Sequence, residues 1–112
     1  MQYDTSVWRQ AIARKKQEQE EKRCDYLSRV KEILMQYFAE GGADSVYICG
    51  SLLSPNSFTD ESDVDIAVSG LVGNALRVSA DLENKIGREI DLIELEDCVF
   101  RAKIEREGLK VL

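Results

Sequence analysis

Two aspartates separated by a single residue stand at the start of an apolar run in the middle of the chain. They are Asp63 and Asp65, in the sequence DVDIAV over residues 63–68. Because successive side chains of a strand point to opposite faces, both carboxylates are expected on one face and the aliphatic side chains on the other. Adjacent carboxylates repel each other and resist removal from water unless a cation lies between them. The pair therefore predicts a site for a hard divalent ion such as Mg²⁺, which prefers oxygen ligands and leaves positions open for phosphate oxygens.

A glycine–serine pair precedes these aspartates. Gly50 and Ser51 directly follow a short apolar run over residues 46–49, which has the length and the β-branched and aromatic content of a buried strand. Glycine tolerates unusual backbone angles, and exposed backbone N–H groups together with a serine hydroxyl suit an anionic phosphate. On its own the pair is best explained as an ordinary strand-to-helix turn with a capping serine. The carboxylates that follow it favour phosphate binding.

A third acid lies on a later predicted strand. Residues 89–95 alternate so that Asp91 shares a face with Ile93 and Leu95. A carboxylate on an otherwise apolar face is costly unless its charge is compensated. Asp91 is therefore either an edge-strand residue that reaches water or a functional residue. Arg88, just before this run, either neutralises phosphate or pairs with a surface acid.

The ordered set of motifs resembles the polymerase-β-like nucleotidyltransferases. Gly50-Ser51, eleven intervening residues and Asp63-Val64-Asp65 are similar to the signature of that superfamily. The pattern is most similar to the minimal nucleotidyltransferase (MNT) group, often found as antitoxin partners of HEPN-domain toxins. Residues 88–93 resemble the strand that carries the third carboxylate, and residues 104–112 resemble the closing helix, turn and strand. The resemblance covers residues 26–112.

The resemblance implies an α/β nucleotidyltransferase fold, with a small mixed sheet that carries helices on one face and an N-terminal helical extension. It implies that ATP and two Mg²⁺ ions bind, with Asp63 and Asp65 ligating both ions. Asp91 would ligate the ion beside the attacking hydroxyl, while Gly50 and Ser51 would hold the β- and γ-phosphates. The implied activity moves AMP from ATP to a hydroxyl, preferably of tyrosine, on a partner HEPN-type toxin, which makes the chain an antitoxin. The alternatives are a binding-only antitoxin with a relic nucleotide site and a small-molecule nucleotidyltransferase.

The segment after the glycine–serine pair departs from the family pattern. Where the family usually has a basic residue and a further arginine, residues 52–58 read LLSPNSF. The cations that face the phosphates must then come from elsewhere. Arg77, Arg88 and a partner protein are the candidates.

Composition and charge narrow the class of protein further. The 112 residues suffice for one compact domain, and 44% hydrophobic and 32% charged residues are typical of a globular chain. No apolar run approaches ~20 residues and no secretory signal pattern is present, so no membrane association is expected. Three widely spaced cysteines and the absence of histidine argue against a disulfide scaffold or a zinc site and predict a cytoplasmic location. The net charge of −6 argues against a nucleic-acid partner.

The remaining patterns predict the elements that position these residues. A polar helical arm over residues 1–25, with N-cap candidates from Asp4 to Ser6 and Trp8 near its tip, precedes the minimal nucleotidyltransferase domain over residues 26–112. We expect the arm to contact a partner or a second copy, which would give a hetero- or homo-oligomer. The predicted order is a helix over 26–38, strands over 45–49 and 64–69, a helix from the Asn74 cap to Gly87, a strand over 89–95, a helix over 98–107 and a strand over 109–112.

Overall fold

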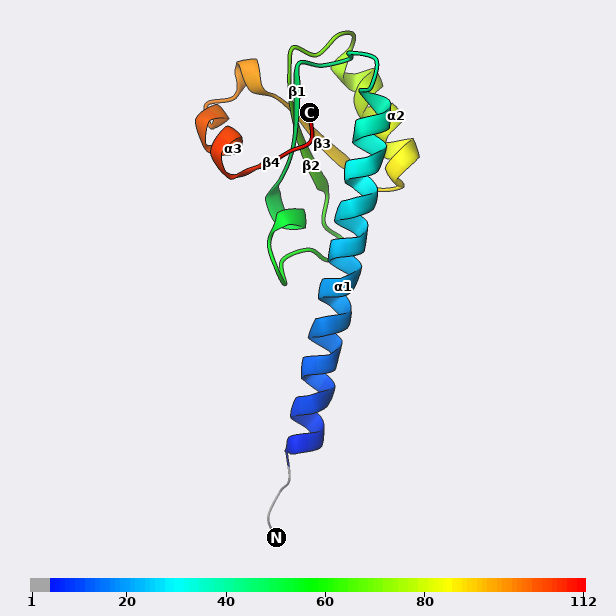
Figure 1. Cartoon of the computed structure of the whole chain (residues 1–112), viewed down its shortest axis with the longest axis vertical. Helices are drawn as coiled ribbons and strands as arrows, with labels where there is room; N and C mark the ends of the chain where they lie inside the picture. Colours follow the sequence, from blue (N-terminus) through cyan, green and yellow to red (C-terminus); the bar gives the residue numbers. More distant parts are fainter. Residues whose placement is uncertain (1–4) are drawn as a thin grey trace.

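The computed structural model describes residues 5–112, which form a four-stranded sheet flanked by helices (Figure 1). In chain order the elements are α1 (Ser6–Tyr37), β1 (Ser45–Cys49), the 3₁₀ turn η1 (Gly50–Leu53), β2 (Val64–Ser69), α2 (Ala75–Ile86), β3 (Ile90–Glu94), the 3₁₀ turn η2 (Leu95–Asp97), α3 (Arg101–Glu107) and β4 (Leu109–Lys110). The strands lie in the order β3-β2-β1-β4. Since β2 is parallel to β3 while β1 is antiparallel to both β2 and β4, the predicted small mixed sheet is confirmed.

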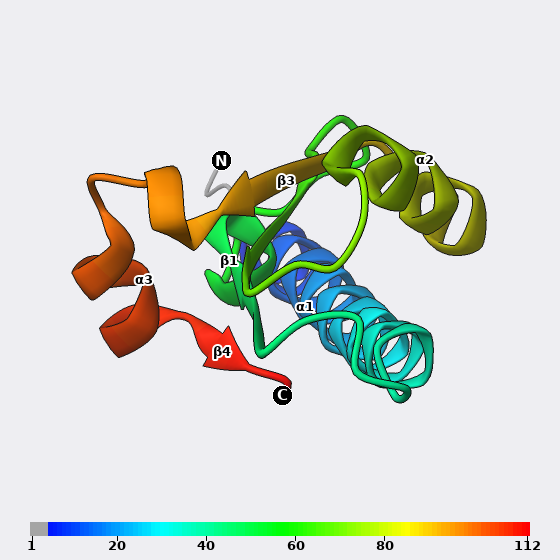
Figure 2. The same cartoon turned by 90° about the horizontal axis from the view of Figure 1, so that it is seen from above.

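The two faces of the sheet are covered by different helices. One face packs against α1 and α2, and its strand residues have no exposed surface: Val46, Ile48, Val64, Ile66 and Val68. The other face carries a smaller cluster of Tyr47, Ala67 and Leu95, against which Ile104 of α3 packs. Figure 2 shows α1 and α2 on one side of the strands and α3 on the other. The expectation that the helices would lie on one face is therefore wrong for α3, because the second face also carries apolar side chains that must be covered.

The first helix packs on the sheet through its second half alone. Val30 and Leu34 are fully buried, whereas every residue from 6 to 19 is exposed and extends beyond the sheet (Figure 1). The predicted boundary at residue 25 falls inside this continuous helix of 32 residues. Neither α1 nor any other helix within residues 5–112 has the length and apolarity needed to cross a membrane.

The ends of α2 follow the predicted capping residues. The Asn74 side chain accepts hydrogen bonds from the backbone N–H groups of Leu76 (2.8 Å) and Arg77 (3.3 Å). Gly87 ends the helix with φ of 80°, in the left-handed region that favours glycine. At α1, Thr5 takes the N-cap position without a side-chain hydrogen bond, and Asp4 lies outside the described residues.

The segment after β3 differs most from the predicted elements. The strand ends at Glu94, and Leu95 turns into η2, where its side chain is buried under the second face of the sheet. As a result α3 begins at Arg101 and not at residue 98, and β4 has two residues instead of four. This turn carries the chain from the edge of the sheet to a position over its second face.

Candidate functional site

The register of the sheet places three side chains of chemical interest in one row. Cys49, at the end of β1, pairs with Asp65 of β2, and Asp65 pairs with Asp91 of β3. Neighbouring strands lie about 5 Å apart, and paired residues project from the same face. The two aspartates, predicted on separate strands, are thus brought together on the face opposite α1 and α2.

Gly50 lets the end of β1 approach the Asp65 carboxylate closely. Its φ of 76° lies in the left-handed region, and a Cβ atom built there would overlap Asp65 Oδ2 and lie 3.0 Å from its Cγ. The predicted phosphate-binding turn and a predicted metal ligand are therefore in direct contact. Ser51 is half-buried in the same turn.

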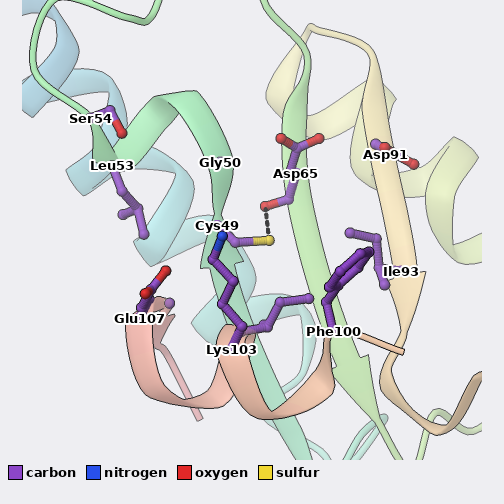
Figure 3. Close-up of a pocket in the computed structure, with 12 residues that line it drawn as sticks. Cys49, Gly50, Leu53, Ser54, Asp65, Asp91, Ile93, Phe100, Lys103 and Glu107 are labelled. Atoms are coloured by element: carbon purple, nitrogen blue, oxygen red, sulfur yellow. Dashed lines mark hydrogen bonds between the residues drawn. The ribbon is translucent and has the colours of Figure 1, made fainter. Parts of the chain in front are cut away.

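A pocket of about 670 Å³ opens over this row of side chains (Figure 3). Its volume falls in the range of pockets that bind small molecules and cofactors. Gly50, Asp65 and Asp91 line the pocket, whereas Asp63 and Ser51 do not. The wall opposite the strands is formed by α3 and the residue before it.

The two aspartates of the pocket are not paired with a cation within residues 5–112. Burial raises the pKa of Asp65, and the carboxylates of Asp91 and Asp63 raise it further. Burial also raises the pKa of the Cys49 thiol to about 11, with repulsion from Asp65 and Asp91 adding to the effect. The thiol is therefore neutral at physiological pH and a poor nucleophile.

The donor set of the pocket fits Mg²⁺. This ion is commonly held by one or two carboxylates together with substrate phosphates and water, and Asp65 and Asp91 supply two carboxylates. Asp63 is exposed directly before β2, yet near enough to affect the Asp65 carboxyl group. Within the described residues no three Asp, Glu, Cys or His side chains are gathered into a complete metal site. Phosphate oxygens and water would therefore complete the coordination.

Arg88 holds the segment between the Gly50-Ser51 turn and β2. Its guanidinium donates to the backbone oxygens of Thr59 (2.7 Å) and Ser62 (2.8 Å). It also lies over the rings of Phe58 (4.5 Å from the centroid) and Tyr26 (5.1 Å). These contacts match neither of its two predicted roles, because Arg88 contacts this segment and, within residues 5–112, neither lines the pocket nor pairs with an acid.

A second set of contacts ties the same segment to α1. Arg23 donates to the backbone oxygen of Leu52 (2.9 Å) and pairs with Glu20 (2.9 Å). Glu20 in turn accepts a hydrogen bond from the backbone N–H of Asn56 (2.8 Å). The turn that begins at Gly50 is thus fixed from the side away from the pocket, where α1 lies.

Phe100 and Lys103 line the pocket, although the sequence analysis singled out neither of them. Together with Glu107 they recur at the three- and four-residue intervals of one helix face. That spacing predicts a shared face of a helix. It does not indicate which part of the molecule the face meets, and so it gives no sign of a pocket.

No model of a known protein family matches the sequence, and no curated protein sequence matches it either. The structure is similar to a chain of the solved toxin–antitoxin MntA-HpeT, in a mutant with two aspartates, two positions apart, replaced by glutamate. The two chains are 13% identical, with a TM-score of 0.59, over 73% of this chain and 71% of that chain. A likeness at this identity concerns the fold. The predicted α/β fold, a small mixed sheet with helices and an N-terminal helical extension, is thereby confirmed.

Proposed function

We propose that this chain is a Mg²⁺-dependent nucleotidyltransferase that moves AMP from ATP to a hydroxyl of a partner toxin and thereby acts as an antitoxin. The observation that carries the proposal is the in-register pair of Asp65 and Asp91 beside Gly50, in a pocket of suitable volume. Two neighbouring carboxylates with no cationic partner in residues 5–112 suit a metal-bound triphosphate better than an uncharged ligand.

Each residue of the site then has a role in phosphoryl transfer. Asp63, Asp65 and Asp91 would hold the Mg²⁺ ions, which when bound neutralise the triphosphate and lower the pKa of an attacking hydroxyl. The turn at Gly50 and Ser51 binds the β- and γ-phosphates. The oxygen of the attacking hydroxyl bonds to the α-phosphorus, and Asp91 takes the proton of that hydroxyl. The bond between the α-phosphorus and the oxygen that bridges it to the β-phosphorus breaks, and pyrophosphate leaves along the turn.

A protein hydroxyl suits the open side of this site. β3 is an edge strand of the described sheet and Asp91 is exposed, so a bulky acceptor reaches it from solvent. Tyrosine is the preferred acceptor, since its hydroxyl stands at the end of a long and rigid side chain. A HEPN-type toxin is the proposed partner, and the likeness to a toxin–antitoxin chain supports this choice. The net charge of −6 disfavours a nucleic-acid acceptor.

The exposed arm of α1 favours a second candidate function. Residues 6–19 are all exposed, and among them Val7 (71%) and Trp8 (66%) present large apolar side chains to solvent. Exposed aromatic side chains often anchor protein interfaces. In a binding-only antitoxin the arm would neutralise the toxin by contact, and the pocket would be a relic.

Intact-mass measurement of the toxin distinguishes the two candidates. The protein encoded beside this chain is incubated with it and MgATP, and we expect the toxin to gain AMP on a tyrosine, located by peptide mapping. Asp91→Asn should remove transfer and largely preserve ATP binding, because its role falls on the attacking oxygen. If the toxin gains no nucleotide but is still neutralised when Asp63, Asp65 and Asp91 are all replaced by asparagine, the binding-only function replaces the proposed one.

A further inference from the structure

The inner face of α3 carries a cation and an aromatic ring that the proposed reaction does not use. We propose that Lys103 binds the triphosphate and that Phe100 stacks on the base of the nucleotide, so that α3 forms the second wall of the nucleotide site. This inference rests on the proposed function, because it concerns the same pocket. It supplies the phosphate-facing cation that the segment over residues 52–58 lacks.

The wall opposite the carboxylates is anchored to the sheet. Ile104 packs against the cluster of Tyr47, Ala67 and Leu95. Directly after α3, a Cβ atom at Gly108 would lie 2.6 Å from the Ile104 backbone oxygen and 3.3 Å from that of Ile48. The glycine therefore lets the chain pass close against β1 before it forms β4. Binding groups on an anchored element hold their geometry better than groups on a loop.

Lys103 is the cation available to a ligand in this pocket. Figure 3 shows its side chain extending from α3 towards Gly50, and no other basic side chain of the described residues lines the pocket. Lys103 makes no ion pair within residues 5–112. Both arginines of α3 already pair with glutamates of the same helix, Arg101 with Glu105 (2.6 Å) and Arg106 with Glu107 (3.7 Å). A triphosphate seated at the Gly50 turn would therefore meet a free ammonium group.

Phe100 offers a ring face without a partner. Its side chain is 65% exposed, lines the pocket, and makes no ring contact with another described residue. It precedes Lys103 by about one turn, a rise of roughly 4.5 Å along the helix. The length of the lysine side chain adds to this separation, which suits a base and a triphosphate joined through ribose. Every base has a face that stacks on an aromatic ring, so this contact gives affinity for nucleotides in general.

Isothermal titration calorimetry on the full chain tests the two contacts separately. The ligands are MgATP and magnesium tripolyphosphate, which has the phosphates without the nucleoside. We expect Lys103→Met to weaken binding of both ligands about tenfold, the effect of losing one charge-assisted hydrogen bond. Phe100→Ala should weaken binding of MgATP about fivefold and leave binding of tripolyphosphate unchanged, since stacking involves the base alone.

Matched controls and a metal-site variant make the outcomes separable. Lys110→Met and Val99→Ala remove an exposed cation and an exposed apolar side chain outside the pocket, and both should bind as the unmodified chain does. The inference about α3 is overturned if Lys103→Met binds both ligands normally, or if Phe100→Ala weakens both ligands equally. The proposed function survives either result if Asp65→Asn still loses Mg²⁺-dependent ATP binding. If the unmodified chain binds neither ligand, both proposals fail.

Discussion

Alternate residues of the same strands build the two faces of the sheet, and the faces hold opposite kinds of chemistry. Along β2, Val64, Ile66 and Val68 have no exposed surface and pack under α1 and α2. Between them Asp65 faces the pocket, with a pKa raised by burial and by neighbouring carboxylates. The difference teaches that neighbouring residues of one strand serve different purposes here, the aliphatic side chains stability and Asp65 the binding of a ligand. A change at the aliphatic side chains of β2 should alter mainly the free energy of unfolding, and a change at Asp65 should alter mainly ligand binding.

The largest effect on stability is expected on the core face. Ile66→Ala should lower the free energy of unfolding by about 3 kcal/mol, because it removes buried atoms and leaves a cavity among closely packed side chains. Ile66→Val should cost about 1 kcal/mol, and urea unfolding measures both. The folded fraction should bind MgATP with unchanged affinity. A loss of affinity in Ile66→Val would show that the two faces are coupled.

Gly50 lies where the turn meets the face of the sheet that carries the pocket. Its substitution should therefore affect both the free energy of unfolding and the affinity for MgATP. Gly50→Ala should cost about 1–2 kcal/mol through its left-handed backbone, with a further cost where the new methyl group meets the Asp65 carboxylate. Gly73 is the matched control, because its φ is 99° and a Cβ atom there would meet nothing within 4 Å. We expect Gly73→Ala to show the backbone cost alone and to leave MgATP affinity intact. Equal losses of affinity in the two variants would contradict the close contact at Gly50.

Substitution of Asp65 is expected to raise the free energy of unfolding, by less than the losses predicted above. Because its folded-state pKa is raised, the ionised carboxylate destabilises the fold at neutral pH, and that cost disappears as the pH falls through the raised pKa towards the usual value. Asp65→Asn should therefore unfold at slightly higher urea than the unmodified chain at pH 7, and the difference should shrink on acidification. The same variant should lose the Mg²⁺-dependent part of its ATP affinity. Lower stability at pH 7 would contradict the repulsion.

The smallest effect on stability is expected in the arm. Deletion of residues 1–19 removes exposed side chains of α1 and should change the free energy of unfolding by less than about 0.5 kcal/mol. Deletion of residues 1–25 also removes Glu20 and Arg23, with their hydrogen bonds to Asn56 and Leu52, and should cost about 1–2 kcal/mol more. Thermal unfolding compares the two truncations. Toxin binding should weaken in both, since both lack Trp8.

Local patterns were sufficient to predict the parts of the site that lie on regular strands and their ends. Strand alternation and the order of the motifs predicted Asp65, Asp91 and Gly50, and the register of the sheet brings these three together. The same alternation placed Asp63 beside Asp65. However, β2 begins at Val64, so Asp63 is not held by strand pairing and lies outside the lining of the pocket.

The rest of the pocket depends on contacts between distant segments. Lys103 reaches it because η2 turns the chain back over the sheet and β4 pairs with β1, and neither event has a local signal. Arg88 was predicted to meet phosphate or a surface acid, but its partners are backbone oxygens of an irregular segment. A sequence pattern specifies side chains and their intervals. It does not specify which carbonyl groups an irregular loop will present.

The continuous helix α1 connects an exposed arm directly to the domain. Residues 6–19 project roughly 20 Å beyond the last contact of the helix with the domain, at the usual rise of an α-helix. Glu20 and Arg23 lie where the helix meets the domain, and they form hydrogen bonds with Asn56 and Leu52 in the segment that starts at Gly50. One continuous helix thus joins Trp8 to the two side chains that hold the turn beside the pocket. A partner bound at Trp8 would therefore be connected to the turn by covalent structure and hydrogen bonds, at a distance from the site itself.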